Sequence, residues 1–503
     1  MKFGKMDKKY IISIDAGTTS SRSIIFDKKG NQIGISQYEF KQIFPKKGWV
    51  EHDPMEILNT QIKSINEVIK SSKVKPEQID SIGIANQRET TIIWNRKTGK
   101  PIYNAIVWQD RRTASVCNEL INEKNKSISI KKLFQDKTGL IIDAYFSGTK
   151  IKWILDNVKN ARSLANNNEL IFGTVDTWLI WNLTNRKKHI TDATNASRTL
   201  LYNIHELRWD DELLNLLNVP ENILPKVCQS SEVIGTTNIL GKKIKIAGIA
   251  GDQQAALFGQ LCLNAGDVKN TYGTGCFCIM NTGETPVKSN NKMLTTIAYQ
   301  INNKTTYAIE GSVFVSGALI QWLRDNLGII KNASEIETLA NSESSSGGLT
   351  FIPSLSGLAA PYWAPNATGN LMGITRDTSN GHIARAALEA IALRCEEIIT
   401  EMEKDSNRKF NDLKVDGGAS KNNLLLQIQS DVLQCNVIRP KITETTALGA
   451  AFLAGLSTGF FKDINSIENI WKKDRSFEPK NDSYLEKVKL LWKKRMNQIL
   501  HSE

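Results

Sequence analysis

The chain has 503 residues, of which 41% are hydrophobic and 23% charged. This balance is typical of a globular protein and excludes a disordered chain or a coiled-coil rod. At about 150 residues per domain, the length predicts two large domains or three smaller ones. No apolar run approaches the roughly 18 residues of a membrane-spanning helix. The basic first ten residues are not followed by the apolar core of a signal peptide, so we expect none.

Lysine and arginine exceed aspartate and glutamate by 64 − 52 = 12 residues. The lysines are scattered in short pairs such as Lys8-Lys9 and Lys472-Lys473, with no basic run and no recognised nucleic-acid motif. We therefore expect a solvated basic surface and no nucleic-acid partner. The excess positive charge can still steer an anionic substrate.

The seven cysteines are dispersed, without a Cys-x-x-Cys pair, and the chain has only five histidines. This pattern favours buried thiols in a reducing compartment, and hence a cytoplasmic protein. Cys276 and Cys278 alternate along a predicted strand and would share one face. A zinc site would need a better spacing of ligands.

The first half of the chain begins with a predicted hairpin over residues 10–27, in which β-branched strands flank a short polar turn. Asp53 and Pro54 are typical of the cap and first position of a helix, and apolar residues then recur at helical spacing. Further strands are expected around residues 82–84 and 91–94. The polar stretch 160–168 predicts a loop.

The second half of the chain again predicts strands, a glycine-turn hairpin and helices. A strand over residues 246–250 is expected to enter a turn at 251–254, and residues 268–281 predict another hairpin. Helices are expected near 383–402 and 424–434, and a loop at 341–348. Alternating strands and helices predict two α/β domains, with a boundary near residues 259–263.

Two familiar nucleotide motifs are absent, because the chain has neither Gly-x-x-x-x-Gly-Lys-Ser/Thr nor Gly-x-Gly-x-x-Gly. A phosphate could instead bind the glycine turn that follows Asp15, where amide and hydroxyl groups can converge. Asp15 could hold Mg²⁺ directly or through water. Alone, this turn also fits a purely structural hairpin. The turns at Thr274-Gly275 and at residues 416–420 are further examples, and together they predict one nucleotide clamped between two domains.

Other residues fit the binding of a polyol. Adjacent Arg88 and Glu89 supply donors and acceptors for hydroxyl groups, although such a pair is more often a solvated strand end. Trp108 and Phe277 can form apolar walls, although such residues more often belong to a core. Asp252 directly follows an apolar strand, a position typical of a functional site.

Seven stretches of the sequence together carry a resemblance to a known family. They are 15–22 (DAGTTSSR), 48–54 (GWVEHDP), 86–91 (NQRETT), 108–112 (WQDRR), 251–260 (GDQQAALFGQ), 270–277 (NTYGTGCF) and 416–419 (DGGA). From about residue 10 to 456, the chain resembles the glycerol kinases of the FGGY carbohydrate kinase family, within the actin-like ATPase superfamily. The Arg88-Glu89 pair with Trp108 indicates glycerol among the family's substrates.

The resemblance implies an α/β fold of two actin-like (ribonuclease H-like) domains with an inter-domain active-site cleft. Residues 1–260 would bind glycerol and carry the phosphate hairpin, and residues 261–503 would bind the nucleotide. The implied reaction is direct in-line phosphoryl transfer from ATP to glycerol, giving sn-glycerol 3-phosphate for glycerol catabolism and glycerolipid synthesis. A homodimer or homotetramer is expected.

The resemblance also implies roles for individual residues. Asp252 would be the general base, and Mg²⁺ would lie near Asp15 and Asp252. Glycerol would contact Arg88, Glu89, Trp108, Tyr145, Asp252, Gln253 and Phe277. The nucleotide would contact Thr18, Thr19, Ser20, Arg22, Thr274, Gly317, Gln321, Gly418 and Asn422, with Arg22 near the transferred group.

One stretch of the sequence differs from the corresponding loop in some members of this family. Bacterial members that fructose 1,6-bisphosphate inhibits carry a glycine-rich loop with an arginine shortly before the catalytic aspartate. Here residues 238–245 have one glycine and no arginine, so we expect no such inhibition. Two other functions stay open on the residues alone: a kinase of another polyol or ketose, and an actin-like assembly protein.

Overall fold

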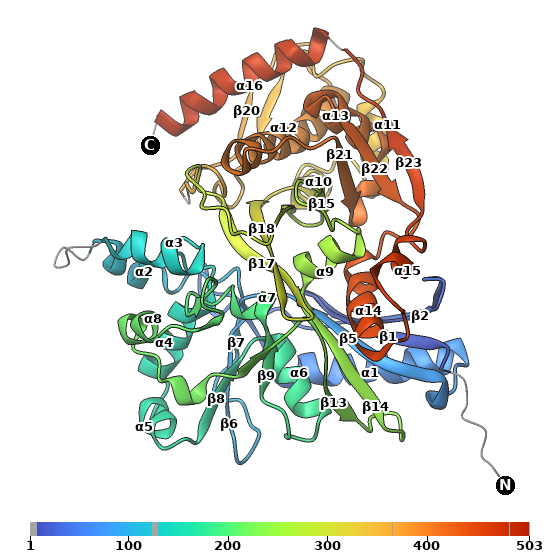
Figure 1. The fold of residues 1–503 in the computed structure, drawn as a ribbon. Helices are drawn as coiled ribbons and strands as arrows, with labels where there is room; N and C mark the ends of the chain where they lie inside the picture. The colour runs from blue at the N-terminus through green and yellow to red at the C-terminus, as the bar shows by residue number, and fades with distance from the viewer. Residues whose placement is uncertain (1–7, 123–128, 365, 482, 502–503) are drawn as a thin grey trace.

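The computed structural model describes residues 8–122, 129–364, 366–481 and 483–501. Two mixed β-sheets organise these residues into two α/β units, one above the other in Figure 1. The blue-to-green first half of the chain builds most of the lower unit, and the yellow-to-red second half builds the upper one. No helix among the described residues is both long and apolar enough to cross a membrane.

The first sheet has six strands, and its central members are apolar on both faces because helices cover both sides. Strand β1 pairs antiparallel with β2 and parallel with β5, which continues parallel to β14. The order is β13 (Ser231–Thr237), β14 (Ile244–Gly251), β5 (Ile79–Asn86), β1 (Tyr10–Ala16), β2 (Ser20–Asp27) and β3 (Gln32–Glu39).

The second sheet repeats this pattern in seven strands. Strand β15 pairs antiparallel with β16 and parallel with β21, which continues parallel to β22. The order is β17 (Leu294–Ile301), β18 (Lys304–Val313), β16 (Cys276–Gly283), β15 (Val268–Tyr272), β21 (Asp412–Asp416), β22 (Asn436–Pro440) and β23 (Lys473–Phe477). The parallel strands of both sheets therefore bring their carboxyl ends, and the turns that follow, toward one region between the units.

Helices and short strand pairs complete both units. The helices are α1 (Pro54–Ser72), α2 (Ala114–Asn122), α3 (Ile130–Thr138), α4 (Ser147–Asn157), α5 (Ala161–Asn166), α6 (Val175–Leu183), α7 (Ala193–Ala196), α8 (Asp211–Leu217), α9 (Asp252–Gly259), α10 (Gly317–Asp325), α11 (Glu335–Ala340), α12 (Asn380–Ser406), α13 (Asn423–Leu433), α14 (Thr445–Thr458), α15 (Ile464–Glu468) and α16 (Ser483–His501). The strand pairs are β4 (Glu51–His52) with β7 (Ala105–Ile106), β6 (Ile92–Asn95) with β8 (Leu170–Gly173), β9 (Ile190–Asp192) with β12 (Lys226–Cys228), β10 (Tyr202–Asn203) with β11 (Arg208–Trp209), and β19 (Thr350–Ile352) with β20 (Asn370–Met372). Three 3₁₀ turns lie at Pro76–Gln78, Glu221–Ile223 and Gly418–Lys421.

Helix α14 belongs to the last part of the chain but packs on the first sheet, against β1, β5 and β14. Figure 1 shows it in orange-red among the blue strands. The contact is backbone to backbone, since a Cβ added to Gly83 of β5 would lie 2.1 Å from the Ala450 carbonyl oxygen of α14. Glycine at this position is thus required by the close approach.

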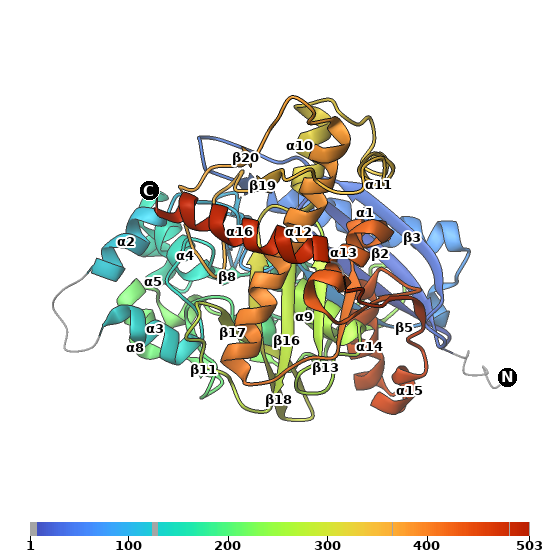
Figure 2. The same ribbon diagram turned by 90° about the horizontal axis from the view of Figure 1, so that it is seen from above.

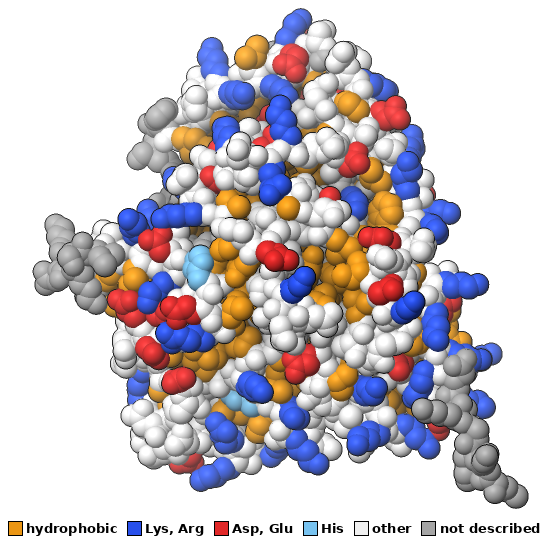
Figure 3. Space-filling model, viewed as in Figure 1, with side chains coloured by type: hydrophobic (Ala, Val, Ile, Leu, Met, Phe, Trp, Pro, Cys, Tyr) orange, Lys and Arg blue, Asp and Glu red, His pale blue; other side chains and the backbone are white. Residues whose placement is uncertain are grey.

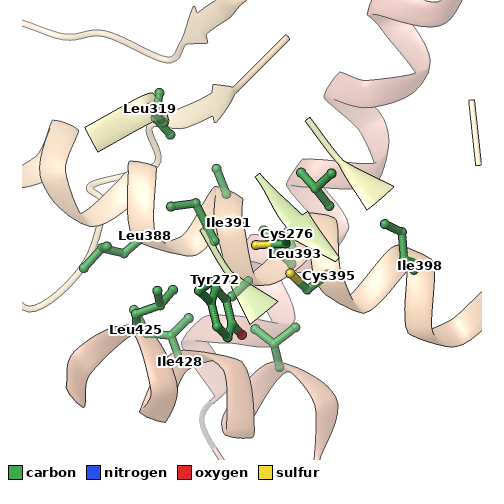
Figure 4. Packing of buried hydrophobic residues seen from close by; sticks show 14 of the residues in the cluster. Tyr272, Cys276, Leu319, Leu388, Ile391, Leu393, Cys395, Ile398, Leu425 and Ile428 are labelled. Carbon is green, nitrogen blue, oxygen red and sulfur yellow. The ribbon is translucent and has the colours of Figure 1, made fainter. Parts of the chain in front are cut away.

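The core of the second unit lies between its sheet and the long helix α12. Figure 4 shows Tyr272 and Cys276 of the sheet packed with Ile391 and Cys395 of α12 and with Ile428 of α13. All seven cysteines are buried and free, as the sequence predicts. Seen from above in Figure 2, α16 runs across α12, where the indole of Trp492 donates to Glu397 at 2.7 Å.

Most predicted elements are confirmed, including both glycine-turn hairpins and the helix capped by Asp53. The loop predicted for residues 160–168 is wrong, because Ala161–Asn166 forms the short helix α5, which buries Ala161 and Ala165. The turn predicted at 251–254 is also wrong, since α9 begins at Asp252 without an intervening loop. Periodicity cannot detect a one-turn helix or a helix that begins directly at a strand end.

Candidate active site

Asp252 is the first residue of α9, directly after β14. This places its carboxylate at the carboxyl end of a parallel strand, where ligands bind in open α/β sheets. The side chain stays 28% exposed, and its Oδ1 lies 3.4 Å from the Nε atom of Arg88. Burial raises the pKa of the Asp252 carboxyl, although the cations of Arg88 and Lys269 oppose the shift.

Arg88 follows β5 and is buried in a network of four charged side chains. Its guanidinium forms a bidentate ion pair with Glu310 of β18, with Nη2 at 2.9 Å from Oε1. Arg198 donates to the same oxygen at 3.0 Å and to Glu89 at 2.6 Å. The two arginines and two glutamates balance in charge, which is the condition for keeping buried ions.

Glu89 lies in an unusual backbone conformation, with φ at +60°. Its carbonyl accepts hydrogen bonds from Ser147 at 2.9 Å and Thr91 at 3.1 Å, and these contacts hold the conformation. Residues with positive φ other than glycine cluster at functional sites because the surroundings must stabilise them. Burial also raises the pKa of the Glu89 carboxyl, although the charges of the nearby Arg198 and Arg88 lower it.

Aromatic side chains from both units meet beside these charges. The ring of Trp108 lies 5.6 Å from that of Tyr145 and 6.2 Å from that of Phe277, in edge-on geometry. Phe277 belongs to β16 of the second sheet, so this contact spans the two units. Arg88 and the hydroxyl of Tyr145 are 3.5 Å apart. The predicted polyol residues therefore come together from five separate stretches of sequence.

The turn between β1 and β2 is closed by the Gly17 amide, which donates to the Ser20 carbonyl at 3.0 Å. Thr18 accepts a hydrogen bond from the Trp108 indole at 3.0 Å, and Ser20 accepts one from Gln37 at 3.0 Å. The side chain of Thr19 is exposed. This turn thus lies beside the aromatic side chains and presents hydroxyl groups there.

Asp15 is the next-to-last residue of β1, close to this turn. Burial raises the pKa of the Asp15 carboxyl to about 6. The Arg22 guanidinium lowers this pKa, whereas the negative charges of Asp252 and Glu444 raise it further. Arg22 lies 4.0 Å from Asp15, but its closer partners are Glu444 and Gln37. Arg22 is therefore held by protein side chains at one edge of the site.

The turn between β15 and β16 contacts the start of α10. Amides of Ser316 and Ala318 donate to the Thr274 carbonyl, and the Gly317 amide donates to the Gly273 carbonyl at 3.0 Å. A Cβ on Gly317 would lie 2.5 Å from that carbonyl oxygen, so only glycine fits. The side chain of Thr274 is exposed and unobstructed.

The third glycine turn lies against the same hairpin. Gly417 has a φ of +85°, and a Cβ there would lie 2.5 Å from the Tyr272 carbonyl oxygen. A Cβ on Gly418 would meet nothing within 4 Å, so this position faces open space. Asn422 caps α13 by accepting from the Leu425 amide at 2.9 Å, while Gln321 is an exposed residue of α10. The second and third glycine turns are therefore in contact in the structure. The Asn422 side chain caps a helix there.

Comparison with known proteins identifies the family. The model of the FGGY family of carbohydrate kinases matches residues 10–259 with its N-terminal domain and residues 268–458 with its C-terminal domain. The chain belongs to this family. It is 55% identical over 492 residues to a glycerol kinase of Deinococcus radiodurans, covering 97% of each chain. It is likewise 55% identical over 495 residues to glycerol kinase 2 of Thermotoga maritima, covering 98% of this chain and 99% of the relative.

Solved structures agree with this assignment. Plasmodium falciparum glycerol kinase, crystallised with ADP, is 36% identical and superimposes with a TM-score of 0.89, covering 98% of this chain and 99% of that one. A xylulose kinase of Lactobacillus acidophilus gives a TM-score of 0.86 at 24% identity, which bears on the fold alone. The predicted family and the predicted two-domain α/β fold class are confirmed.

In this FGGY member, the charge of Asp252 contributes to the raised pKa of Asp15. The described residues contain no group of three side chains that could hold a metal alone. Two carboxylates nevertheless suit Mg²⁺, which commonly takes one or two of them and completes its shell with water and substrate phosphates. The residues present therefore fit this ion.

Sequence reasoning missed the groups that hold the predicted site residues. Glu310 and Arg198 pair with Arg88 and Glu89, and Lys269 donates to Gln253 at 2.5 Å. Burial lowers the pKa of Lys269, although nearby carboxylates oppose it. A signal for Glu310 did exist, since it is one charge inside the largely apolar run 307–313. Arg198 lies in a polar stretch that gives no such signal.

Proposed function

We propose that this chain transfers the γ-phosphoryl group of ATP to glycerol and releases sn-glycerol 3-phosphate and ADP. One observation carries the proposal: the Nε atom of Arg88 is buried without a hydrogen-bond partner among the described residues, 3.4 Å from Asp252. An unpaired donor is costly to bury, and a substrate hydroxyl beside it would satisfy it. The same hydroxyl could donate to Asp252. Relatives named glycerol kinase support glycerol as the polyol.

The remaining polyol contacts follow from chemistry. Glu89 and Gln253 offer acceptors and a donor to the other hydroxyls, and Tyr145 adds a hydroxyl of its own. The rings of Trp108 and Phe277 would pack against the C–H faces of the substrate. Because these two rings come from different units, closing the units around glycerol would exclude water and so limit wasteful hydrolysis of ATP.

In the proposed reaction, Asp252 accepts the proton of the attacking primary hydroxyl. The hydroxyl oxygen forms a bond to the γ-phosphorus while the bond from that phosphorus to the β–γ bridging oxygen breaks, and ADP departs. Such transfer depends mainly on positioning and on neutralising charge. The position of Asp252 at the start of α9, with 28% of its side chain exposed, supports this role.

The nucleotide would bind the three glycine turns. Thr18, Thr19, Ser20 and Thr274 would face the phosphates, with Gly317, Gln321, Gly418 and Asn422 at the adenosine end. Asp15 and Asp252 would hold Mg²⁺, which neutralises phosphate charge when bound. Arg22 would approach the transferred group only by leaving its partner Glu444. Glu444 and the transferred group would therefore compete for Arg22.

Several further proposals depend on the family. Residues 1–260 would form the polyol-binding domain and residues 261–503 the nucleotide-binding domain. We infer a cytoplasmic homodimer or homotetramer that serves glycerol catabolism and glycerolipid synthesis.

The deciding experiment measures substrate-dependent release of ADP with glycerol, xylulose and ribulose in turn. We expect a kcat/KM for glycerol at least a hundredfold above that for either ketose. A preference for a ketose would replace glycerol as the substrate. A chain that sediments in the presence of ATP and shows no activity with any polyol would be an assembly protein instead.

A further inference from the structure

A cavity of about 510 Å³ lies away from the proposed active site, where the turn after β2 meets α14, α15 and the segment leading into β23. Its volume is within the range of sites for small organic molecules. In Figure 3, apolar side chains gather on the face where α9, α14 and α15 lie in Figure 1. The lining residues are Lys28, Lys29, Asn31, Pro440, Lys441, Ile442, Leu448, Ser466, Asn469, Ile470, Trp471 and Lys472.

The charge of the lining is entirely positive, with four lysines and no acidic residue. None of these lysines has an ion-pair partner among the described residues. The nearby carboxylate of Asp27 already accepts from the amides of Lys29 and Asn31 at 2.8 and 2.9 Å. The ammonium of Lys28 instead lies over the ring of Phe460, 5.2 Å from its centre. Four lysines that line one hollow, none of them in an ion pair among the described residues, favour a multiply charged anion.

The inner wall of the cavity is apolar, in contrast to the lysines. Leu448 and Ile470 are buried, and Trp471 is half-buried beside them. A Cβ added to Gly30 would lie 2.2 Å from Ile470, so the turn before β3 packs tightly against this wall. The cavity thus combines a rim that attracts anions with an apolar interior, which is the composition of a specific small-molecule site.

We propose that this cavity binds a phosphate monoester with an apolar or aromatic body, and that its occupancy alters glycerol binding. The phosphate would lie among the lysines, which hold phosphates as point charges. The apolar part would contact Leu448, Ile470 and Trp471.

A buried chain of hydrogen bonds leads from the cavity to the proposed substrate site. The indole of Trp471 donates to Gln260 at 3.1 Å, and Gln260 donates to Asp416 at 2.9 Å. Asp416 also accepts from Thr271 at 2.5 Å. Lys269 then joins Thr271, at 2.7 Å, to Gln253. A displacement of Trp471 therefore changes partners that end beside the proposed glycerol site.

A second connection runs through packed backbones. Leu448 lines the cavity, and the next residue, Gly449, would place a Cβ 1.8 Å from the Ala255 carbonyl oxygen. A Cβ on Gly259 would lie 2.0 Å from the Thr445 carbonyl oxygen. Helices α14 and α9 are thus in direct contact, and α9 begins at Asp252. Tightly packed elements move together rather than deforming.

The binding test uses 1-naphthyl phosphate as the probe, measured by isothermal titration calorimetry. Glycerol and a non-hydrolysable ATP analogue are present at saturation to fill the active site. We expect binding that weakens at least tenfold in Lys28→Gln/Lys472→Gln. The matched control is Lys226→Gln/Lys304→Gln, which removes the same charge from exposed, unpaired lysines elsewhere and should bind as the wild type does. Equal binding by both double variants, or no binding of the probe at millimolar concentration, would overturn the site.

The coupling test rests on the proposed function, whereas the binding test does not. At saturating ATP, the probe should change the KM for glycerol at least twofold in the wild type and leave it unchanged in Lys28→Gln/Lys472→Gln. Trp471→Phe keeps an aromatic wall but removes the donor to Gln260, so it should bind the probe with a smaller change in KM. Binding without any change in the wild-type KM would refute the coupling alone. An unchanged response in the lysine double variant would assign the effect to the active site.

Discussion

The proposed polyol end and the proposed phosphate end of the site are built in different ways. Arg88, Glu89, Arg198 and Glu310 are buried side chains that fix one another through ion pairs. The phosphate end consists of glycine turns whose backbone groups are locked together while the hydroxyls of Thr19 and Thr274 stay exposed. The difference suits the proposed ligands, because preorganised charges can bind a small neutral polyol, whereas amides, hydroxyls and a cation can bind a polyanion.

This contrast predicts that substitutions at the polyol end act more strongly than those at the phosphate end. The largest effect is expected where the two ends meet. Asp252→Asn should lower kcat by about 10²–10⁴-fold, because the proposed base can no longer take a proton. Steady-state ADP release at saturating glycerol and ATP measures this. A variant that keeps more than half of the wild-type kcat would exclude Asp252 as the base.

The second effect concerns stability. Glu310→Gln leaves Arg88 and Arg198 buried without their shared anion, and should lower the free energy of unfolding by about 3–5 kcal/mol. Burial alone would raise the pKa of Glu310, but the two guanidiniums lower it to about 2. Since its folded pKa lies below the unfolded value, its contribution is present above about pH 4.5 and is lost toward pH 2. Denaturant unfolding at neutral pH and near pH 2 should therefore show a difference that shrinks in acid.

A matched control for this experiment is Glu206→Gln. Glu206 pairs with Arg208 at the surface, where both side chains are about half exposed. Exposed ion pairs contribute little, so the unfolding midpoint should not move. Equal destabilisation by the two substitutions would contradict the special position of Glu310.

The third prediction separates the substrates. Arg88→Ala should raise the KM for glycerol by roughly 10–150-fold, the range for one charged hydrogen-bond partner. The KM for ATP should stay nearly unchanged, because the polar partners of Arg88 among the described residues (Gln254, Tyr145, Glu310, Asp252 and Glu89) include none of the residues proposed to contact the nucleotide itself. Equal damage to both KM values would place Arg88 in a nucleotide or purely structural role.

A smaller effect is expected at the phosphate end. Thr18→Val removes a hydroxyl that accepts from the Trp108 indole. Loss of one neutral hydrogen bond, about 0.5–1.5 kcal/mol, should raise KM values only about 2–12-fold. Both substrates should be affected, since Thr18 joins the phosphate turn to the aromatic wall. A change in the KM for ATP alone would show that the contact with Trp108 has no bearing on glycerol.

The smallest effect is expected from fructose 1,6-bisphosphate, which at millimolar concentration should leave activity nearly unchanged. Residues 238–243 form the short connection between β13 and β14, with one glycine and no arginine to grip a phosphate. A dose–response curve at saturating glycerol and low enzyme concentration tests this. Half-maximal inhibition below about one millimolar would contradict it, since exposed lysines alone bind weakly at physiological salt.

Local sequence motifs predicted the candidate site residues, whereas the buried groups that contact them from distant parts of the chain were missed. The glycine turns and Asp252 are readable because their chemistry lies within a few consecutive residues. Arg198 and Glu310 are not, since Arg198 pairs with Glu89 across 109 positions and Glu310 pairs with Arg88 across 222 positions. Periodicity placed the long helices but not α5, whose one and a half turns carry too few residues to show a pattern.

Helix α14 has a consequence for how the protein reaches its native state. The first sheet lacks the cover of α14 until residues 445–458 have been synthesised, although its first strand begins at residue 10. Apolar surface on β1, β5 and β14 would stay uncovered while most of the chain leaves the ribosome. Contacts of such long sequence separation form slowly, and exposed strands invite aggregation in the meantime. A stop codon before residue 445 would remove α14 and leave the parts of β1, β5 and β14 that it contacts without this cover.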